Sequence, residues 1–219
     1  MKLTSINIGK KRTQQNRQKV ETTGIYKIPV QGPVTLSSLG VTQDFIGSPK
    51  HHGGPDQAIY VYGGADYEWW SKELGTELAP GTFGDNLTIS GLASADFNIG
   101  DRLHLGTVIL EVTAPRIPCS TLAARMGDPK FIKRYRDAER PGLYCRVIAQ
   151  GEVKAGVTVT VQRSTGEAVG INEVFRDWYV KEKDEFTLRR FLRAPIAIRA
   201  RKDVERHLEK LLMRGLDTN

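Results

Sequence analysis

The sequence predicts an α+β protein in which a strand-rich, barrel-like domain (residues 1–163) is followed by a small three-helix appendage (residues 167–213). Two observations carry this fold class. Short apolar runs separated by glycine-marked turns continue to about residue 162, and this spacing favours a barrel or sandwich over a parallel sheet. After Arg163 the hydrophobic period becomes helical. A composition with 39% hydrophobic and 26% charged residues is that of an ordinary soluble globular protein.

The predicted strands are short and rich in apolar or aromatic side chains, and they cover residues 4–8, 24–30, 57–62, 86–89, 102–105, 108–112, 143–149 and 157–161. Gly106 and Thr107 separate two of these runs and predict a hairpin. Two helices are predicted between the strands, over residues 66–74 and 120–136. Pro129 divides the second one, because proline cannot continue a helical hydrogen-bond ladder.

Three apolar stripes at helical spacing predict the helices of the appendage. The first stripe comprises Ile171, Val174, Phe175, Trp178 and Tyr179. The second covers residues 188–192 and stops at Pro195, and the third covers residues 204–212. The sequence leaves open whether this appendage closes over a ligand, docks a redox partner or forms a homodimer.

Composition also bounds the compartment and the partners. Two cysteines do not form a disulfide framework, and neither a signal segment nor an apolar run of about 18 residues is present, so we expect a soluble cytoplasmic protein with no membrane partner. The net charge of +7 is concentrated in residues 1–50, which hold eight Lys and Arg against two Asp and Glu. Residues 10–20 contain no aromatic, which favours a solvated basic loop over a nucleic-acid interface. A third reading is that these cations attract an anionic small molecule.

Two glycine-rich segments carry polar side chains that could hold a ligand. In residues 50–56 (KHHGGPD), Gly53 and Gly54 allow a turn whose N–H groups point at an anion, beside the cation of Lys50 and the carboxylate of Asp56. In residues 80–88 (PGTFGDNLT), a turn runs into a strand with Asn86 among its polar residues. Taken alone, each segment is better read as an ordinary surface turn.

The third segment, residues 115–120 (PRIPCS), predicts an activated cysteine. Arg116 lies three residues before Cys119 and stabilises the thiolate, the form that acts as nucleophile or metal ligand. If Ser120 begins a helix, the helix N-terminus favours the thiolate further. Cys145, by contrast, lies in an apolar strand and is predicted to be an inert core thiol.

Taken together and in this order, the three segments resemble the MOSC domain, the family related to the C-terminal domain of molybdenum cofactor sulfurases, and most closely its YiiM-type branch. The stretches that carry the resemblance are residues 50–62, 80–92, 99–105, 114–122 and 140–157. The helical end is similar to the three-helix appendage of that branch, so the resemblance spans almost the whole chain.

The resemblance implies a Mo-pyranopterin (molybdenum) cofactor with Cys119 as the protein ligand of the metal, in keeping with the softness of a thiolate. It implies that Lys50, Arg116 and the turn at His52, Gly53 and Gly54 cradle the pterin phosphate. Asn86 is expected to contact the pterin. His52 and Asp56 are assigned, as a hypothesis, to donating or positioning a proton.

The sequence departs from the family pattern at two positions. Asp85 stands where the family usually has Glu, and Thr121 stands where it commonly has Lys, a loss for which Arg125 could substitute. The implied function is the reduction of N-hydroxylated small molecules (hydroxylaminopurines, amidoximes, hydroxylamines) with electrons from a separate reductase. The alternative is a sulfur carrier or cofactor-handling protein that uses a persulfide on Cys119.

Overall fold

The computed structural model describes residues 1–16, 19–49 and 52–216. Its strands are β1 (Leu3–Gly9), β2 (Arg12–Asn16), β3 (Lys19–Thr23), β4 (Lys27–Pro29), β5 (Val34–Ser37), β6 (Gly40–Val41), β7 (Ile59–Gly63), β8 (Leu87–Ile89), β9 (Arg102–Leu105), β10 (Val108–Ala114), β11 (Leu143–Ala149), β12 (Gly151–Val153) and β13 (Val159–Gln162). Its helices are α1 (Gly64–Leu74), α2 (Ser120–Met126), α3 (Phe131–Ala138), α4 (Ile171–Asp177), α5 (Glu185–Arg193) and α6 (Ile198–Leu216), with single 3-10 turns η1 (Pro55–Gln57) and η2 (Ser94–Asp96).

The main sheet has eight strands in the order β13-β9-β10-β11-β7-β8-β1-β4. It confirms the strand-rich α+β class, but the expectation of a closed β-barrel is wrong, because no ladder joins β13 to β4. The chain before β13 reaches only the start of β1, where Gly156 N donates to Leu3 O at 2.7 Å and Leu3 N donates to Val157 O at 3.0 Å. The contact continues to the first residue of β13, where Val159 N donates to Met1 O at 3.0 Å, but it amounts to one isolated bridge between Lys2 and Thr158.

One pair of neighbours in the otherwise antiparallel sheet is parallel. Strands β7 and β8 run in the same direction, with Val61 opposite Leu87, and α1 makes the crossover between them. The helix ends at Gly75, whose left-handed φ of 67° fits the glycine preference at this position. This crossover brings the polar segment after Phe83 beside the segment that follows β6.

The basic stretch near the N-terminus is not a loop, as the sequence suggested, but two paired strands whose side chains are mostly exposed. Strands β2 and β3 pair antiparallel with Gln14 opposite Glu21, and the Gln14 side chain donates to Glu21 and to Thr121 O of α2. Cross-strand polar pairs and a β-propensity from Thr and Val hold this hairpin without an alternating apolar pattern, which is why it escaped sequence analysis.

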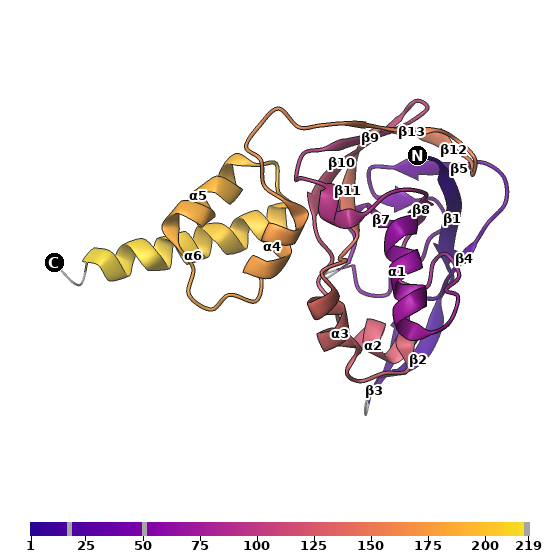
Figure 1. Ribbon diagram of the computed structural model, residues 1–219, viewed down its shortest axis with the longest axis horizontal. Coiled ribbons are helices and arrows are strands. Elements are labelled where there is room, and N and C mark those ends of the chain that lie inside the picture. The colour runs from indigo at the N-terminus through magenta and orange to yellow at the C-terminus, as the bar shows by residue number, and fades with distance from the viewer. Residues whose placement is uncertain (17–18, 50–51, 217–219) are drawn as a thin grey trace.

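The helical appendage consists of α4, α5 and α6, which gather at one side of the strand-rich body (Figure 1). Buried apolar contacts continue from the sheet into it through residues such as Ile171, Leu188 and Val204. The division into domains at residues 163–167 stays a prediction, since the two parts share this core. Within the described residues no helix is long and apolar enough to cross a membrane.

Candidate functional site

A cavity of about 660 Å³ lies between the loops of the strand-rich body and the helical appendage. Its wall contains Cys119, Arg116, His52 and Gly53 from the predicted segments, together with residues of α6 such as Arg199. The structure therefore brings all three segments of the sequence together around one space, since Gly84 and Asn86 of the second segment also line it. A cavity of this size is in the range of cofactor and drug-sized ligand sites.

Cys119 stands immediately before α2, which begins at Ser120 as predicted. Although burial by itself raises the pKa of its thiol, a hydrogen bond with His52, the nearby Arg116 guanidinium and a hydrogen bond with the backbone of Leu122 together lower the pKa to about 6. The thiolate therefore predominates at neutral pH. By contrast, burial raises the pKa of the Cys145 thiol in β11, which confirms the inert core cysteine.

Arg116 is a buried cation at the floor of the cavity, only 5% exposed. Its Nη1 donates to the carbonyl of Phe83, and its guanidinium lies 4.9 Å from the centre of the Tyr60 ring. Its Nε is buried and has no hydrogen-bond partner in the described part of the chain. A buried donor without a partner costs free energy, so an anionic ligand that reached the Arg116 guanidinium would be favoured.

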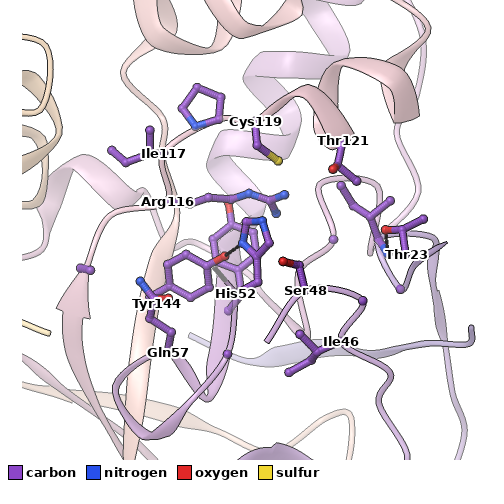
Figure 2. Close-up of a pocket in the computed structure, with 18 of the residues that line it drawn as sticks. Thr23, Ile46, Ser48, His52, Gln57, Arg116, Ile117, Cys119, Thr121 and Tyr144 are labelled. Atoms are coloured by element: carbon purple, nitrogen blue, oxygen red, sulfur yellow. Dashed lines mark hydrogen bonds between the residues drawn. The ribbon is translucent and has the colours of Figure 1, made fainter. Parts of the chain in front are cut away.

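His52 lies between the thiol and a tyrosine that sequence analysis did not single out. Figure 2 shows the sulfur of Cys119, the Arg116 guanidinium and the His52 ring around the same space, with Tyr144 beside His52. The Tyr144 hydroxyl is 3.4 Å from His52 Nδ1, and His52 N donates to Ser48 O at 2.8 Å. Gly53 follows with a φ of +91°, where an added Cβ would lie 2.7 Å from Cδ1 of Ile46.

Other predicted site residues lie elsewhere. Asp56 does not line the cavity: its carboxylate accepts from Ile198 N at 2.7 Å and pairs with Arg146 Nε at 3.2 Å, so it fastens the start of α6 to the strand-rich body. Gly54 also lies outside the cavity wall, as does Arg125, whose guanidinium covers the Tyr26 ring at 4.6 Å instead of replacing the missing lysine. Lys50 lies outside the described residues.

Asn86 borders the cavity, but its amide is engaged within the protein. Its Oδ1 accepts from Tyr60 N at 3.1 Å, and its Nδ2 donates to Asp44 Oδ2 at 2.9 Å. Asp44 in turn forms an ion pair with Lys27, and both residues line the cavity. Neither belongs to a recognisable motif, and no signal in the sequence places positions 27, 44 and 86 side by side.

These residues fit a metal that brings most of its own ligands. Within the described ranges no group of three His, Cys, Asp or Glu side chains could hold a metal ion alone. One thiolate at Cys119 leaves the remaining coordination to an organic group. The buried guanidinium of Arg116 and the backbone at Gly53, which has a positive φ and no side chain, suit an anionic part of such a group.

Fold and site together define a strand-rich α+β protein with one activated cysteine in the wall of a cavity. The chain belongs to the MOSC domain family, whose profile matches residues 48–160, and to its YiiM-type branch. MOSC domains are associated with molybdenum cofactor binding.

Three similar proteins support this assignment. The uncharacterized protein YflK of Bacillus subtilis is 30% identical over 86% of this chain and 85% of its own length. A protein named Reductase from Gibberella moniliformis is 35% identical over 64% of this chain, a match that covers 26% of that longer protein. The crystal structure of YiiM from Geobacillus stearothermophilus superposes with a TM-score of 0.78 at 26% identity, over 94% of this chain and 98% of that one.

Proposed function

We propose that this protein is a molybdenum-cofactor-dependent oxidoreductase that reduces N-hydroxylated compounds. The observation that carries the proposal is the half-buried Cys119 thiolate, with its pKa of about 6, in the same cavity wall as the buried cation of Arg116. The fungal relative named Reductase supports an oxidoreductase class. The reaction consumes two electrons and two protons and converts R–NH–OH into R–NH2 and water.

Each residue of the site has a task under this proposal. Cys119 would hold the metal, while Arg116 and the turn at Gly53 would bind the anionic part of the cofactor. The bound cofactor would supply the two-electron chemistry. His52 contacts the Cys119 thiol and Tyr144, and histidine is the side chain that exchanges protons most readily near neutral pH, so we assign it to proton delivery.

The electrons must come from another source, and we propose a separate reductase. The match to the fungal Reductase covers only 26% of that protein, so most of its length has no counterpart in the match. Asp56 keeps a structural task under this proposal, because its carboxylate is engaged with α6 and Arg146.

The test is cofactor content. Wild type, Cys119→Ala and Cys145→Ala would be produced in a host that makes molybdenum cofactor, and molybdenum and pterin would be measured per chain. We expect near-stoichiometric metal in wild type and in Cys145→Ala, and loss of metal in Cys119→Ala. The loaded wild type should then oxidise a chemical electron donor in the presence of a hydroxylaminopurine.

A different result would favour the other reading of the site. If wild type from such a host carries neither molybdenum nor pterin, the reductase proposal fails. A mass increase of one sulfur atom on Cys119 in that material would then identify a persulfide carrier, for which a thiol of low pKa is equally suited.

A further inference from the structure

The first helix of the appendage departs from its sequence pattern at one residue. The apolar stripe places Trp178 on the same helical face as Ile171 and Phe175, which are buried, yet Trp178 is 57% exposed. It follows directly after α4 and lines the cavity. Of the large apolar side chains that are exposed in the described chain, Trp178 is the one that borders this cavity. Places where the local pattern fails are often functional.

Two other side chains of the α4 segment are anchored outside the cavity wall, which fixes the position of Trp178. Phe175 packs within the aromatic cluster, its ring 6.4 Å from Tyr135 and 5.6 Å from Tyr179. Arg176 pairs with Glu139 through an Nε–Oε1 contact of 2.6 Å. The helix therefore cannot roll to bury Trp178 without breaking these contacts.

The start of α6 is held against the same side of the cavity. Arg199 donates to Gln57 Oε1 at 3.0 Å and to Pro49 O at 2.9 Å. Together with Val174 and Ala200, which also line the cavity, these contacts make the appendage a fixed wall beside Trp178. Trp178 itself has no side-chain hydrogen bond and no ring partner among the residues that the structure describes.

We infer that Trp178 is a stacking platform that makes the site select substrates with a planar ring over small acyclic ones. An indole face binds flat π-systems by stacking and dispersion. A ligand without a ring gains no stacking energy from such a surface. This inference rests on the proposed function and deepens it, since it names the part of the cavity that distinguishes one class of substrate from another. Trp178 is a specificity residue, remote in the chain from Cys119 and not part of the reacting groups.

The experiment compares Trp178→Ala and Trp178→Phe with Phe186→Ala, a control on α5 that removes another exposed ring, one outside the cavity wall (Phe186 is 69% exposed and Trp178 57%). Steady-state kinetics of the loaded enzymes would be measured with 6-hydroxylaminopurine and with methylhydroxylamine. We expect Trp178→Ala to raise KM for the purine roughly tenfold, the size of one lost stacking contact, and to leave KM for methylhydroxylamine unchanged. Trp178→Phe should retain most of the affinity, and Phe186→Ala should match wild type.

Adenine binding, measured by calorimetry on the same proteins, provides a readout without turnover. Weaker adenine binding in Trp178→Ala alone supports the inference even if neither substrate is reduced, in which case only the proposed reaction fails. If wild type reduces both compounds but Trp178→Ala changes both KM values equally or neither, the inference is overturned while the reductase proposal stands. Failure of wild type to bind adenine also overturns it.

Discussion

Lys27 and Asp44 form an ion pair in the wall of the cavity, and their side chains are only 8% and 5% exposed. Asp44 also accepts hydrogen bonds from Gly9 N at 2.7 Å and from Asn86 Nδ2 at 2.9 Å. Burial lowers the pKa of Lys27, and the charge of Asp44 opposes this effect. The carboxylate thus connects β1, β4 and the segment before β8.

Replacing Asp44 by Asn should destabilise the fold, because it leaves the Lys27 ammonium buried without a counter-charge. We expect a loss of about 3 kcal/mol in the free energy of unfolding, measured by urea denaturation. Adding Lys27→Met removes that charge, so the double variant should be more stable than Asp44→Asn alone. If the loss of unfolding free energy in the double variant equals the sum of the losses in Asp44→Asn and in Lys27→Met alone, the two side chains are not coupled.

This network also marks the limit of what the sequence can predict. Local signals located the start of α2 at Ser120 and the break near Pro129, because prolines and caps act on their own neighbours. The joining of Lys27, Asp44 and Asn86 depends on strand pairing between distant segments, which no local pattern encodes. The family motifs identified Arg116, Cys119 and His52 as site residues, and the structure shows that the three line one cavity.

The β2–β3 hairpin and the contacts of Asp56 were not predicted from the sequence, each for a physical reason. The β2–β3 hairpin is held by polar pairs such as Gln14 with Glu21, so its residues read as a loop. Asp56 is a carboxylate in a motif beside a histidine, which suggested proton transfer. In the structure its carboxylate contacts Arg146 and the first turn of α6, which are 90 and 142 positions away in the chain and could not be anticipated.

The reactivity of Cys119 should follow its lowered pKa. Since only the thiolate is alkylated, the rate with iodoacetamide on cofactor-free protein should have its midpoint near pH 6 and fall about tenfold per pH unit below it. His52→Ala should move this midpoint upward, because the His52 hydrogen bond is the strongest of the effects that lower the pKa. Peptide mass spectrometry separates this site from Cys145, and a midpoint near pH 9 in wild type would contradict the expectation.

The same pKa shift links Cys119 to stability. The folded-state pKa lies below the ordinary value of 9.0, so the thiolate stabilises the fold fully above pH 9 and this contribution is lost as the pH falls through 6. The difference in unfolding free energy between wild type and Cys119→Ser should therefore shrink as the pH is lowered from 9 to 6. A difference that is constant over this range would argue against a thiolate in the fold.

Gly53 and Gly54 form a matched pair for testing the cradle. Both have a positive φ, +91° and +86°, so alanine strains the backbone at either position by roughly 1 kcal/mol. Only at Gly53 would the new Cβ press on Cδ1 of Ile46 in the cavity wall, at 2.7 Å; at Gly54 the nearest atom is Arg199 Nη2 at 3.8 Å. We expect Gly53→Ala and Gly54→Ala to have similar melting temperatures, but Gly53→Ala to contain less molybdenum. Equal molybdenum content in the two variants would show that Gly53 does not help to bind the cofactor.

Asp56→Asn should separate a structural carboxylate from a catalytic one. The variant keeps an oxygen that can accept from Ile198 N but loses the ion pair with Arg146, which is 27% exposed at its side chain, so we expect a stability loss of roughly 1 kcal/mol or less. Because Asp56 does not line the cavity, the pH dependence of kcat should keep its wild-type shape, whereas His52→Ala should alter it. If the pH dependence of kcat changes in Asp56→Asn while the melting temperature does not, Asp56 takes part in proton transfer.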